Sequence, residues 1–156
     1  MKGNPKIIDT LNKLLANELA AINQYMVHSG MCGNWGYTVL DDTIQNRAKD
    51  EMKHAHRLID RILFLGGTPI VNNLDPITIG AFVPDMHNND HSAEITAIQG
   101  YNDAIALCSD YGDNDTRTLL EDNLNDETRH IDWIESQITQ IEQIGVPDYL
   151  AQQIYD

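Results

Sequence analysis

The sequence has few cysteines, few basic residues and no long apolar run. Its two cysteines, Cys32 and Cys108, form no CxxC pair, so a metal site built from thiolates is excluded. Ten lysines and arginines face 24 acidic residues, and a net charge of −14 argues against nucleic-acid binding, which requires clustered cations. No stretch approaches the roughly 18 apolar residues of a membrane span, and no secretory signal is visible. We therefore expect a cytoplasmic protein that binds neither nucleic acid nor membrane, with both cysteines reduced.

Strand signals are nearly absent, and prolines and glycines divide the chain into helical blocks. Asn4-Pro5 is typical of a helix start, Thr38 is a candidate N-cap, and the glycines at 36, 66, 112 and 145 are typical of helix ends. The stretch 67–83 has two prolines and no helical period, which predicts a long crossover connection. We expect one all-α domain over 1–156: a four-helix bundle with a crossover between its second and third helices and a short fifth helix. The expected helices are residues 5–35, 39–66, 84–111, 115–144 and 147–154.

Each long helix carries an apolar stripe at the 3.6-residue period with a glutamate in its middle. The stripe of the first helix includes Leu11, Leu15, Glu18, Ile22 and Tyr25, and that of the second Ile44, Arg47, Glu51, His54 and Leu58. The third has His87, His91, Glu94, Ile98, Tyr101 and Ile105, and the fourth Leu120, Leu124, Glu127, Ile131 and Ile134. An unpaired buried carboxylate costs several kcal/mol, and facing carboxylates repel one another. Such a cluster predicts that cations fill it.

Two histidines follow glutamates in a repeated E-x-x-H pattern, Glu51–His54 and Glu127–His130. Residues at this spacing project from the same face of a helix. The glutamates on the first and third helices precede these pairs by equal intervals. The residues of a lone E-x-x-H motif on an acidic helix usually lie on its solvent-exposed face. Two copies on apolar stripes instead predict a dinuclear metal centre. Mixed carboxylate and imidazole ligands favour iron or manganese.

Three segments resemble the bacterioferritin family: LNKLLANELAAINQYMVHSGMCGNWG, DEMKHAHRLIDRILFLGGTP and DETRHIDWIESQITQIEQIGVPDYLAQQI. The resemblance covers essentially the whole chain and implies a ferritin-like bundle. It also implies six ferroxidase ligands, of which Glu51 and Glu127 bridge two irons: Glu18, Glu51, His54, Glu94, Glu127 and His130. Tyr25 matches the tyrosine beside this centre, where it donates a hydrogen bond or an electron. A core tyrosine with a satisfied hydroxyl fits the same position.

The resemblance further implies iron storage and detoxification, with ferroxidase activity. Two Fe(II) are oxidised by O2 or H2O2, and ferric iron is mineralised inside a homo-oligomeric shell of about 24 chains built from two-fold dimers. A b-type haem shared between two subunits assists iron release, with a small ferredoxin as electron donor. By this resemblance, Met52 matches the axial haem ligand. It follows Glu51 directly, so its side chain is expected to point about 100° away from the iron centre. The residues expected to line the haem pocket are Leu19, Ile22, Asn23 and Met26.

The chain also departs from the family pattern. Asn46 replaces a common histidine, and Gly66 and Thr139 stand where acidic residues often line the subunit pores, so the iron route stays open. Two other functions also stay open. One is a different di-iron enzyme of this fold, a peroxidase or an oxygenase, although the chain has neither a cysteine-iron domain nor an additional substrate domain. The other is a non-catalytic haem-binding subunit that assembles with a different ferritin chain, which the intact ligand set disfavours.

Overall fold

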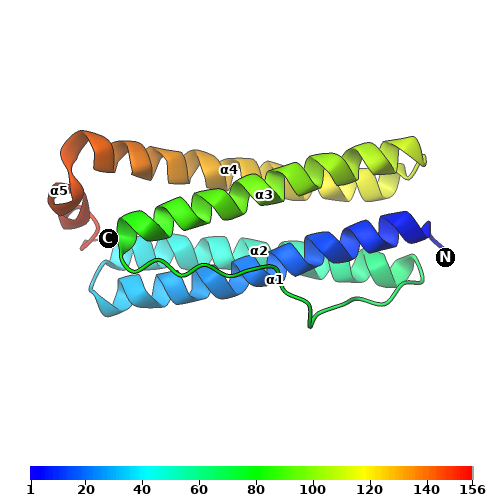
Figure 1. The fold of residues 1–156 in the computed structure, drawn as a ribbon, viewed down its shortest axis with the longest axis horizontal. Helices are drawn as coiled ribbons and strands as arrows, with labels where there is room; N and C mark the ends of the chain where they lie inside the picture. Colours follow the sequence, from blue (N-terminus) through cyan, green and yellow to red (C-terminus); the bar gives the residue numbers. More distant parts are fainter. Residues whose placement is uncertain (156) are drawn as a thin grey trace.

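Four long helices and one short helix form an elongated bundle in the computed structural model, which describes residues 1–155 (Figure 1). The helices are α1 (Pro5–Asn34), α2 (Thr38–Phe64), α3 (Val83–Asp110), α4 (Asn114–Ile144) and α5 (Val146–Ala151). Helices α1 and α2 form one antiparallel hairpin, α3 and α4 form a second, and the hairpins pack on each other. The prediction of a ferritin-like four-helix bundle with a long crossover and a short fifth helix is confirmed.

The helix ends lie within three residues of the expected positions. The side chain of Asn4 accepts a hydrogen bond from the backbone nitrogen of Lys6 at 2.8 Å and so caps α1. Thr38 is not an N-cap, because the first helical hydrogen bond of α2 already runs from the nitrogen of Asp41 to the carbonyl of Tyr37. Glycines 36, 66, 112 and 145 all have positive φ, which explains why each long helix stops where it does.

Apolar side chains pack in two clusters, and a band of charged side chains lies between them. The first cluster joins the beginning of α1 to the end of α2 and includes Leu11, Leu15, Leu58, Ile62, Tyr101 and Leu120. The second joins the end of α1 to the beginning of α2 and includes Tyr25, Cys32, Leu40, Ile44, Met86 and Tyr149. A fully buried leucine or isoleucine contributes about 1.5–3 kcal/mol. The two clusters therefore stabilise a bundle whose middle is polar.

The crossover between α2 and α3 lies along α1, and α1 side chains hold its backbone (Figure 1). The amide of Thr78 donates to Oε1 of Gln24 at 3.0 Å, and the amide of Gly80 donates to Nε2 of His28 at 3.0 Å. Gly80 also packs against the first turn of α3, where an added Cβ would overlap the backbone nitrogen of Met86. The crossover is therefore an ordered strap along α1.

One expected stripe position is wrong. His91, expected on the buried face of α3, is 31% exposed and contacts Glu135 at 2.9 Å. Its neighbour Asp90 is fully buried instead, because it pairs with Arg47 of α2 and His28 of α1. Within residues 1–155, no helix is both long and apolar enough to cross a bilayer.

The close approach of Gly80 to α3 predicts opposite effects for two glycine substitutions. Gly80→Ala should lower the free energy of unfolding by about 1–3 kcal/mol, because the new methyl group displaces backbone rather than a flexible side chain. Gly30→Ala in α1 should raise it by roughly 0.5–1 kcal/mol, because no atom lies near the new methyl and alanine favours the helix. Circular-dichroism unfolding curves of both variants test this. Equal midpoints would contradict the packing described for Gly80.

Candidate metal centre

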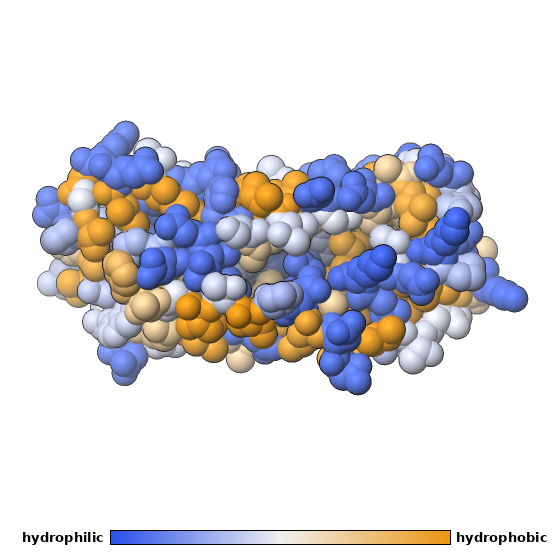
Figure 2. Space-filling model, viewed as in Figure 1, coloured by the Kyte–Doolittle hydropathy of each residue, from blue (hydrophilic) through white to orange (hydrophobic). Residues whose placement is uncertain are grey.

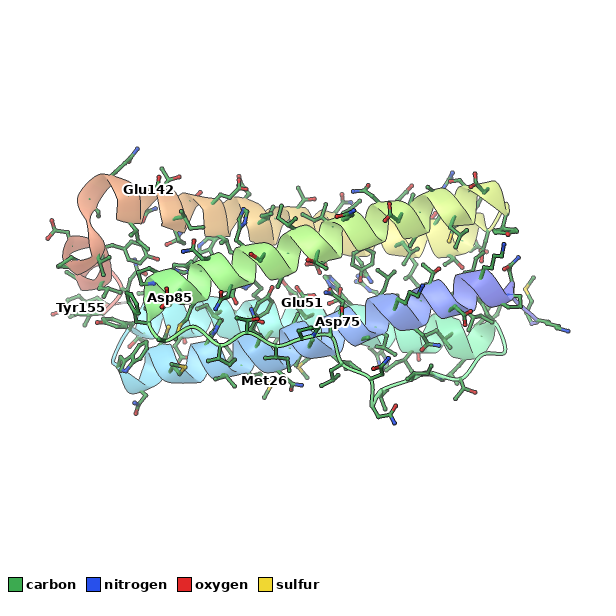
Figure 3. The ribbon with its side chains drawn as sticks, viewed as in Figure 1. Met26, Glu51, Asp75, Asp85, Glu142 and Tyr155 are labelled. Carbon is green, nitrogen blue, oxygen red and sulfur yellow. The ribbon has the colours of Figure 1, made fainter. Side chains whose placement is uncertain are left out.

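Side chains from all four long helices meet in the middle of the bundle and form two overlapping clusters. One consists of Glu18, Glu51, His54 and Glu127, and the other of Glu51, Glu94, Glu127 and His130. Within each cluster the possible ligand atoms lie within 4.8 Å of one another, and all these residues are buried. Figure 3 shows Glu51 between the two hairpins. The structure thus brings together all six residues that the sequence suggests as ligands, and Glu51 and Glu127 belong to both clusters.

Both histidines turn Nδ1 toward the glutamates and Nε2 toward an outer aspartate. Nδ1 of His54 lies 3.0 Å from Glu51, and its Nε2 lies 2.8 Å from Oδ2 of Asp126. Nδ1 of His130 also lies 3.0 Å from Glu51, and its Nε2 lies 2.9 Å from Oδ2 of Asp50. A carboxylate that accepts from the far ring nitrogen fixes the tautomer and the ring orientation. Sequence reasoning missed this role, although each aspartate directly precedes the glutamate of an E-x-x-H pair.

Two buried tyrosines bind the glutamates of α1 and α3. The hydroxyl of Tyr25 donates to Oε1 of Glu94 at 2.6 Å, and that of Tyr101 donates to Oε1 of Glu18 at 2.7 Å. Burial first, and then the neighbouring glutamate, raises the pKa of both tyrosines well above the usual value, so both hydroxyls keep their protons. The sequence analysis did not include Tyr101 among the site residues. It follows Glu94 by the same interval by which Tyr25 follows Glu18, and this repeat could have revealed it.

The empty cluster holds protons because its carboxylates are buried together. Burial first, and then the charge of Glu18, raises the pKa of Glu51 and of Glu127 well above the usual value. Burial alone would lower the pKa of His130, but the nearby carboxylates of Glu127 and Glu94 raise it to about 10. Burial alone would raise the pKa of Glu94, but its close neighbours Glu127 and His130 lower it to about 2. Excess negative charge is thus balanced here by shared protons.

Several atoms of the site are buried with no hydrogen-bond partner. They are Oε2 of Glu18 and Glu94, Oε1 of Glu51 and Glu127, and Nδ1 of His130. Nδ1 of His130 and Oε1 of Glu51 lie 3.0 Å apart but form no hydrogen bond with each other. A buried polar atom without a partner costs about 1–3 kcal/mol, and these atoms converge on the two clusters. Carboxylate oxygens and imidazole nitrogens are ligands for divalent iron or manganese. The donor set therefore fits two cations that share the glutamates of α2 and α4.

A second buried charged group lies beside the centre. Asp90 accepts hydrogen bonds from Gln24 at 2.8 Å and from Arg47 at 2.6 Å, and it contacts Nδ1 of His28 at 2.8 Å. The guanidinium carbon of Arg47 lies 4.3 Å from the ring centroid of Tyr25. Arg47 stood on the predicted stripe, but nothing in its own helix indicated its partner on α3. This group joins α1, α2 and α3 next to the site.

A surface pocket of about 200 Å³ lies between α2 and α4 and is lined on one side by His130 of the centre. Its lining includes Asn46, Asp50, Arg129 and His130. Asn46 is an exposed residue of this lining, at the position where the sequence departs from the usual histidine.

The residues suggested as haem contacts lie away from the metal cluster. Met52 is 53% exposed and Met26 is 55% exposed. Asn23 is also exposed, whereas Leu19 and Ile22 are partly buried against the core. Figure 2 shows apolar side chains along the lower edge of the molecule over α1, and Figure 3 places Met26 on that edge, away from α3 and α4. The structure thus leaves both methionines on the outside of the α1–α2 hairpin.

Comparison with known proteins gives matches over nearly the whole chain. Residues 8–144 match the Ferritin family, which is described as a ferritin-like domain. The chain is 42% identical over 155 residues to "Bacterial ferritin" from Synechocystis, with 99% of both chains covered. It is 39% identical over 152 residues to "Bacterioferritin" from Mycolicibacterium paratuberculosis, covering 97% of this chain and 96% of the relative. It is 37% identical over 149 residues to "Bacterioferritin" from Brucella melitensis, covering 96% and 92%.

The raised pKa values predict that the metal-free protein becomes less stable as the pH rises. A group whose pKa is higher in the folded than in the unfolded chain stabilises the fold below its unfolded pKa, and this contribution is lost as the pH rises through the folded pKa. For His130 the loss spans pH 6.5 to about 10, and for Glu51 and Glu127 it begins near pH 4.5. Thermal unfolding of metal-free protein across this range should show a falling midpoint. Glu51→Gln should have a shallower slope, and identical slopes in both proteins would contradict the burial of charge described for Glu51.

Proposed function

The chain belongs to the bacterioferritin family of ferritin-like proteins, and from this membership we propose that it oxidises Fe(II) and stores the ferric product within a protein shell. In this proposal iron is the substrate and the cargo. The six residues Glu18, Glu51, His54, Glu94, Glu127 and His130 form the ferroxidase centre.

The overlap of the two clusters is the observation that supports this function most strongly. Each cluster supplies four possible ligands, and Glu51 and Glu127 are common to both, which is the arrangement that bridging carboxylates require. The four glutamates balance the charge of two Fe(II) when both histidines are neutral. Glu18 with His54 would then complete one iron position, and Glu94 with His130 the other.

The chemistry that follows is the paired loss of electrons from two neighbouring ions. Two Fe(II) together give two electrons to O2, which takes up two protons to become H2O2. Alternatively, they give two electrons to H2O2, which takes up two protons to become two waters. The glutamates would stabilise the added positive charge of Fe(III). Asp50 and Asp126 would keep both imidazoles oriented throughout. The pocket of about 200 Å³ that His130 lines would give Fe(II) and the oxidant an approach to this centre from the surface.

We propose in addition that two copies of the chain hold a b-type haem between their Met52 side chains. The exposure of Met52 and Met26 on the same outer hairpin supports a contact with a second copy. Such a haem would supply electron transfer for iron release, and Leu19, Ile22 and Asn23 would lie around it with Met26. A shell of about 24 chains, a small ferredoxin as electron donor and a cytoplasmic location stay predictions from the resemblance.

Stepwise addition of Fe(II) in air to the metal-free protein tests the proposed function. We expect a fast rise in ferric absorbance that saturates near two irons per chain, followed by slow growth of soluble ferric mineral. Glu127→Gln should slow the fast phase at least about tenfold, because it removes a carboxylate shared by both iron positions. His91→Gln is the matched control and should leave the fast phase unchanged, since His91 lies outside both clusters.

One outcome would contradict storage, and another would contradict a shell built from this chain alone. Saturation near two irons with later iron precipitating outside the protein would indicate a di-iron peroxidase or oxygenase. A second chain of different mass in native mass spectrometry of material from the source would indicate co-assembly with another ferritin.

The haem proposal predicts that iron oxidation and haem binding can be separated. Met52→Leu should abolish the Soret absorption of haem-loaded protein and keep the fast ferroxidase phase, because Met52 points away from both clusters. Met26→Leu should keep the Soret band, since leucine preserves an apolar lining. A Met52→Leu protein that still binds haem with an unchanged spectrum would overturn the assignment of the ligand.

A further inference from the structure

A chain of hydrogen bonds runs from the surface of α2 to one carboxylate of the metal cluster. Nη1 of Arg57 donates to Oδ1 of Asn123 at 2.9 Å, and Nδ2 of Asn123 donates to the hydroxyl oxygen of Tyr101 at 3.2 Å. The hydroxyl of Tyr101 donates to Oε1 of Glu18 at 2.7 Å. Arg57 is exposed, whereas Asn123 and Tyr101 are completely buried. Four residues from four helices are therefore linked by hydrogen bonds, and each donor in the chain lies on the side of Arg57.

The chemistry of the donors fixes the direction of this chain. A guanidinium can only donate, so Arg57 requires the amide oxygen of Asn123 to face it. The amide nitrogen must then face Tyr101 and donate to its oxygen. The single hydroxyl proton of Tyr101 is thereby directed to Glu18. Without Asn123 in this orientation, the tyrosine would have a competing acceptor for its proton.

Glu18 uses its two oxygens differently as a result. Oε1 accepts from Tyr101, while Oε2 is buried with no hydrogen-bond partner and lies 3.6 Å from Nδ1 of His54. An oxygen that already accepts a short hydrogen bond is a weaker ligand than a free one. The geometry therefore favours Oε2 of Glu18 over Oε1 as the oxygen that binds a cation.

We propose that Tyr101, oriented by Asn123 and Arg57, is a positioning residue that restricts Glu18 to binding metal through one oxygen. This inference rests on one part of the proposed function, namely that the clusters bind two cations. It does not depend on iron oxidation or storage. Tyr101 itself need not touch either cation.

The other half of the centre is built differently, which makes the inference testable on one cation at a time. Under the sequence offset that superposes the two sets of ligands, Tyr25 corresponds to Tyr101, and Arg47 corresponds to Asn123. Arg47 lies over the ring of Tyr25 and bonds to Asp90, so its guanidinium contacts the ring face and not the hydroxyl. The hydroxyl of Tyr25 binds Glu94 with no amide directing it. Loss of the Tyr101 hydroxyl should therefore affect one metal position and spare the other.

Cobalt(II) binding to the metal-free protein tests this, since the visible d–d absorption reports coordination at each ion. Wild-type protein should bind about two cobalt ions per chain. In Tyr101→Phe, Glu18 is free to bind through both oxygens, which raises the coordination number and lowers the absorption of one ion. The affinity of that ion should fall roughly tenfold, the usual cost of losing an outer hydrogen bond to a ligand. The second ion should keep its wild-type absorption and affinity.

Asn123→Asp separates positioning from packing because it keeps the size of the side chain. Paired with Arg57, the new carboxylate would accept the hydrogen bond from the hydroxyl of Tyr101, which Glu18 would then lose. This variant should therefore show the same loss at the same ion as Tyr101→Phe. Tyr25→Phe should alter the other ion, and Tyr111→Phe, at the exposed end of α3, should alter neither.

The outcomes distinguish a positioning role from a structural one. A Tyr101→Phe protein with wild-type cobalt spectrum and affinity but a lower unfolding temperature would overturn the inference, because Tyr101 would then be a core tyrosine only. Equal weakening of both cobalt ions would overturn it as well, since the effect would then be general to the bundle. Wild-type protein that binds two cobalt ions but does not oxidise Fe(II) would overturn the proposed function, while the cobalt spectra would still decide the role of Tyr101.

Discussion

The packing of four glutamates away from water is the constraint on which the rest of this structure depends. Burial first, and then their mutual repulsion, raises the pKa of Glu51 and Glu127, and the nearby carboxylates raise the pKa of His130. The surrounding structure offsets this cost with apolar clusters on either side of the polar band and hydroxyl donors to Glu18 and Glu94. The residues around the ligands thus hold the glutamates in place. Bound cations would remove the remaining repulsion between the carboxylates, because the metal charge would replace the protons that now balance them.

Most of the fold could be predicted from the sequence because helical periodicity and helix-ending glycines are local signals. The stripes located the four long helices, and the proline-containing stretch indicated the crossover. The burial of Asp90 in place of His91 could not be predicted, because an apolar stripe is about 100° wide and covers neighbouring positions. What places Asp90 inside is Arg47 on another helix, and a single helix's pattern carries no information about such a partner.

The candidate site could be predicted as far as it repeats itself. The paired glutamates and E-x-x-H motifs suggested six residues that the structure brings together, and the same repeat contains Tyr101, Asp50 and Asp126. The repeat fails where the halves differ. Asn123 corresponds to Arg47, and no spacing rule indicates that an amide in one half performs a task for which the other half has no equivalent. The asymmetry arises from contacts between helices, which only the folded chain reveals.

The division of the ligands between the hairpins has a consequence for how the protein folds. Each cluster takes one glutamate from the opposite hairpin, Glu127 for one and Glu51 for the other. Neither hairpin alone can assemble four ligands, so a divalent cation has no complete site until the crossover has closed and the hairpins have docked. Metal binding therefore stabilises only the product of the last folding step, the docking of the two hairpins. The two hairpins would therefore dock while the protein is still metal-free. Protons would balance the buried carboxylates at that stage, and the incoming ions would later displace them.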